Sequence, residues 1–194
     1  MTFEPGIYPF ELFGTQHVGV ILLLLCTYIM LFVFRKSLRS EKTDKVFRWS
    51  FASLLMIQEI ALNIYRFQYD LWTLDHALPL HFCNMLVLAS IYLMITINKT
   101  VFDVVYLLGL AGTLQAILTP ALRQGLPHFR FFQFFFAHGG IIFASLYFVF
   151  VHNYKPTFIS VKRTFLIVNL SLPPVMLMNW LTGGNYNNLN RVPD

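Results

Sequence analysis

The chain has 194 residues, of which 57% are hydrophobic and only 12% are charged. Soluble proteins carry about 25% charged residues, and a soluble fold this apolar would expose large hydrophobic patches to water. These proportions exclude a soluble globular protein and predict an integral membrane protein whose partners are membrane lipids. The net charge of +5 does not indicate a nucleic-acid partner, because basic residues in short loops serve to orient membrane spans.

Six apolar stretches run through the sequence, and each is long enough to cross a bilayer. A hydrocarbon core about 30 Å thick requires about 20 apolar residues per helix. The stretches cover residues 15–34, 47–69, 79–97, 101–120, 130–152 and 164–182. We find no internal repeat and no linker that would separate domains. The sequence therefore predicts one all-α domain over residues 1–194, a polytopic transmembrane bundle of six helices.

Lys and Arg residues are unevenly divided between the two sides of the predicted bundle. Ten lie in the loops that follow the first, third and fifth stretches, against four on the other side. Because cytoplasmic loops carry the excess of basic residues, we expect a multi-pass protein with its N-terminus outside. The ten are Arg35, Lys36, Arg39, Lys42, Lys45, Arg48, Lys99, Lys155, Lys162 and Arg163, and the four are Arg66, Arg123, Arg130 and Arg191.

Most polar residues of the spans fall in the half of the bundle nearer the outer side. A charge at the centre of a bilayer costs about 2.5–3.5 kcal/mol, so such residues are informative. In the second span, Glu59, Asn63 and Arg66 follow an i, i+4, i+7 spacing and share one helical face. Glu59 lies too deep to stay ionised alone, so we expect it to pair with Arg66 or to be protonated.

This gathering of polar side chains at one depth predicts a polar cavity open to the outer leaflet. We expect Arg130 and His128 at its mouth, where they could meet a lipid phosphate, and Glu59 and Gln115 deeper, where they would orient other groups. The alternative is that each residue only forms hydrogen bonds between helices or snorkels to the surface. The candidate substrate-binding residues are Glu59, His81, Gln115, His128, Arg130 and Asn185.

Cys83 and His138 are the candidate catalytic pair. Cys83 lies in the first turn of the third span, just after Pro79, a residue favoured at the first helical position. The positive end of the helix dipole favours a thiolate there. His138 lies several residues into the fifth span and precedes two glycines, which allow a neighbouring helix to approach closely. A cysteine and a histidine are the minimum for nucleophilic acyl transfer.

Other readings of these side chains remain open. Cys83 could be a small buried hydrophobic residue without a chemical role, and Cys26, in the middle of the first span without polar neighbours, is expected to be a bystander. A metal site could use His81, Cys83, His128 and His138. The sequence has no pair of histidines at i, i+4 and no Cys-x-x-Cys motif among these residues, so we expect no metal and no cofactor.

Four segments resemble the YwaF-like family of bacterial integral membrane proteins, which is related to TMEM-type intramembrane acyltransferases that remodel ether phospholipids. These segments are Pro79–Asn84 (PLHFCN), Gly112–Pro120 (GTLQAILTP), His128–Gly139 (HFRFFQFFFAHG) and Gly184–Tyr186 (GNY). The resemblance implies a protein of the bacterial plasma membrane. It also implies a seventh span after the Asn-Tyr motif, so that this chain would be a fragment or a six-span variant.

The resemblance assigns roles to two residues. In the eukaryotic relatives the cysteine that matches Cys83 carries the acyl group, and the histidine that matches His138 is its partner. The expected function is therefore an intramembrane acyltransferase that acts on phospholipid acyl chains through a Cys-His dyad. The alternative is a non-catalytic transporter or binding protein for a lipid or small polar solute. A covalent acyl adduct on Cys83 discriminates between the two.

Overall fold

The computed structural model describes residues 9–191, and its regular structure is almost entirely helical. Four helices, α1, α4, α5 and α6, are long and apolar enough to cross a membrane, which agrees with the expected membrane bundle. The helices are α1 (Thr15–Phe34), α2 (Glu41–Gln68), α3 (Phe82–Thr96), α4 (Lys99–Leu118), α5 (Phe129–Phe150) and α6 (Phe158–Thr182), with short 3-10 turns η1 (Ser37–Arg39) and η2 (Tyr186–Asn188).

Two helices begin six residues earlier than the hydropathy pattern predicts. Helix α2 begins at Glu41 because the hydroxyl of Ser40 accepts a hydrogen bond from the backbone of Thr43 and caps the helix. Helix α6 begins at Phe158 because Thr157 and Ser160 form a reciprocal capping box. The hydropathy pattern leaves the first residues of both helices in loops because hydropathy alone does not detect a cap.

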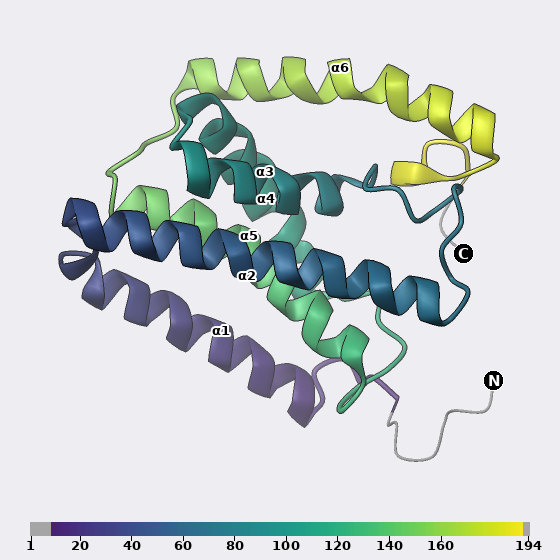
Figure 1. Ribbon diagram of the computed structural model, residues 1–194, viewed down its shortest axis with the longest axis horizontal. Coiled ribbons are helices and arrows are strands. Elements are labelled where there is room, and N and C mark those ends of the chain that lie inside the picture. The colour runs from purple at the N-terminus through teal and green to yellow at the C-terminus, as the bar shows by residue number, and fades with distance from the viewer. Residues whose placement is uncertain (1–8, 192–194) are drawn as a thin grey trace.

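Helix α3 is the shortest of the six. Its 15 residues span about 22 Å, less than the hydrocarbon core of a bilayer. It begins at Phe82 with His81 at the N-cap position, so Pro79 precedes the helix instead of opening it as expected. Figure 1 shows α3 beginning well short of the ends of α2 and α6. The segment 69–81 therefore runs back toward the bundle centre, and the N-terminus of α3 is recessed.

Helix α5 is the central element of the bundle. It packs against α1, α2, α3 and α4, and most of its side chains are buried. At Gly109 of α4 a Cβ atom would lie 2.7 Å from Ile141 of α5, so the two helices are in close contact. Helices α1 and α6 lie at the periphery (Figure 1). Most of their apolar side chains are exposed. Exposed apolar surface on peripheral helices is what a lipid environment requires.

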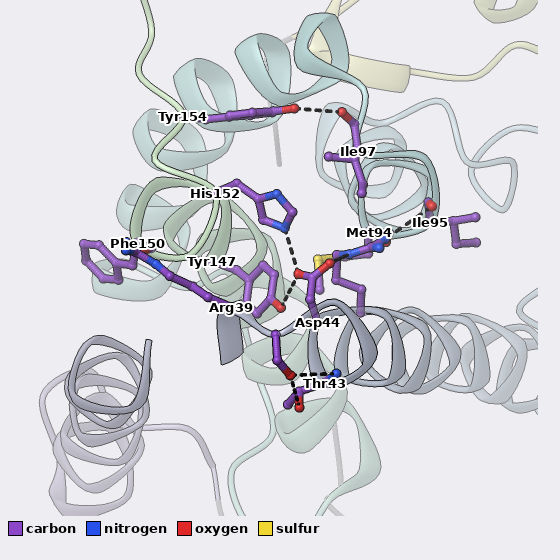
Figure 2. A network of polar contacts seen from close by, with 12 residues as sticks. Arg39, Thr43, Asp44, Met94, Ile95, Ile97, Tyr147, Phe150, His152 and Tyr154 are labelled. Atoms are coloured by element: carbon purple, nitrogen blue, oxygen red, sulfur yellow. Dashed lines mark hydrogen bonds and ion pairs between the residues drawn. The ribbon is translucent and has the colours of Figure 1, made fainter. Parts of the chain in front are cut away.

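A buried polar network joins three helices at one end of the bundle, which we call the basic end (residues 35–40, 97–98 and 151–157 and the helix turns beside them). Asp44 accepts hydrogen bonds from the hydroxyl of Tyr147 and from Nε2 of His152, both at 2.8 Å. Its second oxygen lies 2.8 Å from Nε of Arg48. Arg48 also donates to the carbonyl of Met94 at the end of α3. Figure 2 shows Asp44 with Tyr147 and His152 in this network. The network fixes the relative depth of α2, α3 and α5.

Candidate functional site

The opposite end of the bundle, which we call the site end, consists of segments 69–81, 119–128 and 183–191 and the helix turns beside them. Cys83 is the second residue of α3 and its thiol is half-buried. Three residues at i+4, i+7 and i+11 from Cys83 share its face of the helix. They are fully or nearly fully buried, namely Val87, Ser90 and Met94. Cys83 therefore lies on the face of α3 that packs into the bundle and not on a lipid-facing side.

His138 is buried in α5, and its ring has one defined hydrogen bond. Nδ1 lies 2.8 Å from the backbone carbonyl of Phe134. Because a carbonyl only accepts, Nδ1 carries the proton, and in the neutral imidazole Nε2 has the lone pair. No hydrogen bond joins His138 to Cys83 in residues 9–191. The structure thus provides a histidine in the tautomer of a general base, with the thiol outside hydrogen-bonding contact.

Cys83 and His138 lie at similar depths in the bundle. Helices α3 and α5 both run from the site end to the basic end, where Arg48 and Asp44 link Met94 to Tyr147. Cys83 precedes Met94 by eleven residues, about 16 Å of helix, and His138 precedes Tyr147 by nine residues, about 14 Å. The recessed start of α3 is what brings the thiol down toward the level of the imidazole.

A chain of side-chain hydrogen bonds connects α5 to Glu59 on α2. Arg130 donates to Gln133, Gln133 donates to Gln58 at 3.1 Å, and Gln58 donates to Glu59 at 2.9 Å. Gln58, Glu59 and Gln133 are all buried. Two glutamines therefore link a positive and a negative side chain that do not touch, and they satisfy polar groups that would be costly to leave unpaired.

The direct partner of Glu59 is Gln58 and not Arg66, so the first of its two expected states, an ion pair with Arg66, is not found. Arg66 donates to the backbone carbonyl of Ala77 at 3.1 Å, in the segment before α3. Its charge still acts on Glu59, together with that of Arg130. The i, i+7 spacing correctly places Glu59 and Arg66 on one face, but the arginine side chain extends toward the end of the helix, where a carbonyl is available.

His128, Arg130 and Gln115 occupy different positions in the site end. His128 is the N-cap of α5, where its Nδ1 accepts a hydrogen bond from the backbone of Arg130 at 3.1 Å, and its ring meets Tyr65 edge-on. Arg130 is half-buried one residue into the helix. Gln115 is exposed on α4. His128 and Arg130 thus lie together at the start of α5, whereas Gln115 lies on a separate helix.

A model of the TMEM164 family matches residues 12–194. The chain belongs to the TMEM164 family. The matched residues include Cys83, His138 and every candidate binding residue. Comparison with curated proteins gave no match, and comparison with solved structures gave none. The comparisons therefore establish a TMEM-type membrane family.

His81 and Asn185 contact the C-terminal segment of this TMEM164-family chain. Nδ1 of His81 lies 3.3 Å from the backbone N–H of Asn187, and its ring packs against Tyr186. The side-chain oxygen of Asn185 accepts hydrogen bonds from the backbone of Asn190 at 3.0 Å and of Arg191 at 3.1 Å. Asn185 thus closes its own turn, whereas His81 joins the start of α3 to that turn.

Tyr186 and Asn179 are site-end residues that the sequence did not single out by role. Tyr186 is fully buried, and its backbone N–H and C=O both pair with the side chain of Asn179 on α6. Burial raises the pKa of the Tyr186 phenol, so the hydroxyl stays protonated. It donates to the carbonyl of Leu74 at 2.8 Å and accepts from the backbone of Leu78 at 3.0 Å. The Gly-Asn-Tyr motif was the available signal, but it does not reveal these partners.

Two apolar grooves flank the contact between α1 and α5. They enclose about 650 and 510 Å³, and both are lined by Leu23, Leu24 and Phe136. In the smaller groove Tyr28 donates to the carbonyl of Gly139 at 3.1 Å. His138 is not among the residues that line either groove, although Phe131 and Phe135 of the larger groove lie on the same side of α5 as the imidazole.

Metal-binding geometry is not found in residues 9–191, where no three His, Cys, Asp or Glu side chains gather closely enough to hold an ion. The expected bystander thiol, Cys26, is exposed on α1. The chemistry available at the site end is therefore that of a thiol, an imidazole, a glutamine-linked charge pair and helix N-termini.

Proposed function

We propose that this protein is an intramembrane acyltransferase that moves acyl chains between phospholipids, with Cys83 as nucleophile and His138 as general base. The observation that carries the proposal is the hydrogen bond from Nδ1 of His138 to the carbonyl of Phe134. It leaves Nε2 with the lone pair that accepts a thiol proton. The similar depth of the two residues and the inward face of Cys83 support the pairing.

In the first half-reaction, Nε2 of His138 takes the proton of the Cys83 thiol. The sulfur then attacks the ester carbonyl carbon of a donor phospholipid. The carbon–oxygen bond to glycerol breaks, and the leaving oxygen takes the proton from His138. A thioester on Cys83 and a lysophospholipid result. The N–H groups of Cys83 and Asn84 have no acceptor within the helix and can stabilise the negative oxygen of the tetrahedral intermediate.

In the second half-reaction, the hydroxyl of an acceptor lysophospholipid gives its proton to Nε2 of His138. The hydroxyl oxygen attacks the thioester carbonyl, the carbon–sulfur bond breaks, and the Cys83 sulfur recovers the proton. The net change is transfer of one acyl chain with no oxidant, reductant or water consumed. His128 and Arg130 at the start of α5 would hold the phosphate of either lipid.

We place the protein in a bacterial plasma membrane, as a YwaF-like member of the family, with its N-terminus outside and the site end toward the outer leaflet. The motifs around Cys83 and His138 support the YwaF-like assignment. The excess of Lys and Arg at the basic end supports the orientation. The donor and acceptor are then lipids of the outer leaflet.

The decisive experiment is a search for an acyl adduct on Cys83. The purified full-length chain is incubated in vesicles with a phospholipid bearing an isotope-labelled acyl chain, and its cysteine peptides are analysed by mass spectrometry. We expect a hydroxylamine-sensitive acyl mass on the Cys83 peptide and none on the Cys26 peptide. Absence of the Cys83 adduct under conditions that exchange acyl chains would reject the mechanism.

The grooves beside α1 favour a second candidate function, that of a non-catalytic lipid-binding or transport protein. Their lining is almost wholly apolar, and neither Cys83 nor His138 is among the lining residues. In that case Cys83→Ala would leave lipid binding and transport unchanged, and no acyl chain would exchange. The adduct experiment thus separates the two candidates.

A further inference from the structure

The segment that follows α6 contacts the first turn of α3 directly. We call residues 183–191 the strap. Asn187 of the strap accepts a hydrogen bond from the backbone N–H of Phe82 at 2.7 Å and donates to the carbonyl of Leu80 at 3.1 Å. Its own backbone N–H points to Nδ1 of His81 at 3.3 Å. The side chain and the backbone N–H of Asn187 thus contact the three consecutive residues Leu80, His81 and Phe82.

The strap is itself anchored on two sides. Asn179 of α6 pairs with both backbone groups of Tyr186, at 2.7 and 3.0 Å. The Tyr186 hydroxyl bridges two backbone groups of the segment 69–81. At Gly184 a Cβ atom would lie 2.5 Å from the carbonyl oxygen of Asp75, so the strap is pressed against this segment. Asn187 is therefore presented to α3 from a rigid support.

The N-terminus of α3 depends on this contact because it lacks a cap of its own. The first backbone N–H groups of a helix have no acceptor within the helix, and the N-cap side chain usually supplies one. His81 occupies the N-cap position of α3 without a side-chain capping hydrogen bond. The acceptor for Phe82 comes instead from Asn187, 105 positions later in the chain. Cys83 is the next residue.

We propose that the strap fixes the first turn of α3 and that Asn187 is a positioning residue for Cys83. The inference rests on the proposed role of Cys83 as nucleophile. Without the Asn187 side chain the first turn of α3 opens more often. Cys83 then becomes more accessible to small reagents while it is held less often at the place where acyl transfer needs it.

The test compares two neighbouring asparagines with the same backbone conformation. Asn187 and Asn188 both have positive φ, 55° and 54°, so glycine replaces either without backbone strain. Asn187→Gly removes both side-chain hydrogen bonds to the start of α3. Asn188→Gly is the matched control because Asn188 is exposed and makes no hydrogen bond to α3 in residues 9–191. Asn187→Asp keeps the acceptor oxygen and serves as the rescue variant.

The readout is the alkylation rate of Cys83 by a small maleimide in the purified full-length chain, measured by peptide mass spectrometry relative to Cys26. We expect Asn187→Gly to raise the relative rate about tenfold, since two hydrogen bonds that hold the turn are lost. Asn188→Gly should stay within about twofold of the parent and Asn187→Asp within about threefold. Equal rates for Asn187→Gly and Asn188→Gly would overturn the inference.

Tyr186→Phe provides a second test should Asn187→Gly fail to fold. It removes only the hydroxyl that bridges Leu74 and Leu78, and we expect a rise of about threefold in the relative rate. An unchanged rate in this variant would also count against the strap.

Acyl exchange measured on the same samples separates the two proposals. If the parent forms no acyl adduct, the proposed function fails while alkylation still decides the role of Asn187. If the parent forms the adduct and Asn187→Gly alters neither measurement, only the strap inference fails.

Discussion

Nδ1 of His138 donates to the backbone carbonyl of Phe134, 2.8 Å away and one turn earlier in α5. In many nucleophilic enzymes a carboxylate performs this orienting role. A carbonyl of the same helix fixes the tautomer without placing a second charge in the membrane, where charge is costly. The ring is also held against the Phe134 side chain, with centroids 4.1 Å apart. These contacts leave Nε2 available for proton transfer and lead to the first two predictions.

The first prediction concerns the two thiols. Cys83→Ser should lower acyl exchange between phospholipids by at least about 100-fold, because a hydroxyl is far harder to deprotonate than a thiol. Cys26→Ser should retain the parent rate, since Cys26 is exposed on α1 and its neighbours Leu25 and Thr27 offer no base and no charge. The rate is measured by mass spectrometry of labelled lipids in vesicles that contain equal amounts of folded protein. Full activity in Cys83→Ser would exclude a thioester mechanism.

The second prediction concerns the base. His138→Gln should lower the exchange rate by about 10²–10⁴-fold, the range of general-base catalysis. Combined with Cys83→Ala, the two losses should not multiply, because the residues act as a unit. His76→Gln is the control, since the exposed ring of His76 pairs with Thr73 and Asp75 on segment 69–81 and not with Cys83 or His138. Independent, multiplying effects of His138 and Cys83 would show that they do not form a dyad.

The number of helices follows from sequence because hydropathy is a local property. The start of α3 does not, because its capping residue Asn187 is 105 positions away from Phe82. Likewise, the spacing of Glu59 and Arg66 shows a shared face but not that Arg66 finds the carbonyl of Ala77 first. A pattern read along one helix does not reveal hydrogen-bond partners that come from distant segments of the chain.

The network at the basic end shows a second reason why the sequence pattern does not predict all contacts of the structure. Arg48 counts as a loop charge in a hydropathy profile, yet it is buried in α2, where Asp44 neutralises it. A hydropathy profile scores each residue alone and does not account for two buried charges that neutralise each other. The same holds for Gln58 and Gln133, whose role emerges only when Arg130 and Glu59 are seen at the two ends of one chain.

The third prediction tests orientation in the membrane. In a chain without its two native cysteines, Ser40→Cys at the basic end should react with an impermeant thiol reagent only after the cytoplasm is opened. Gln124→Cys at the site end should react from outside in intact cells. Both positions lie in connecting segments between helices. The reverse labelling pattern would place the site end in the cytoplasmic leaflet and contradict the proposed orientation.

The fourth prediction concerns the paired charges at the basic end. Arg48→Ala leaves the Asp44 carboxylate buried beside Tyr147 and His152 without its arginine partner. Removal of one member of a buried ion pair costs about 3–5 kcal/mol in unfolding free energy. The double variant Asp44→Asn with Arg48→Met should lose less than Arg48→Ala alone. Denaturant unfolding in detergent measures the unfolding free energy of both variants. Glu41→Gln, on the exposed first turn of α2, is the control. Equal losses in all three variants would show that the pair is not coupled.

The last prediction compares two glycines with opposite surroundings. A Cβ atom at Gly184 would lie 2.5 Å from the carbonyl oxygen of Asp75, a backbone atom that cannot rotate away. Gly184→Ala should therefore lower the unfolding free energy by about 1–3 kcal/mol. It should also raise the alkylation rate of Cys83, because the strap must shift. Gly112 in α4 has no atom within 4 Å of its built Cβ, so Gly112→Ala should be neutral or stabilising by up to about 1 kcal/mol. Thermal unfolding measures the stability of the two variants, and maleimide labelling measures the alkylation rate of Cys83 in each. A Gly184→Ala protein as stable as Gly112→Ala, with unchanged labelling of Cys83, would show that the contact between Gly184 and Asp75 does not hold the strap in place.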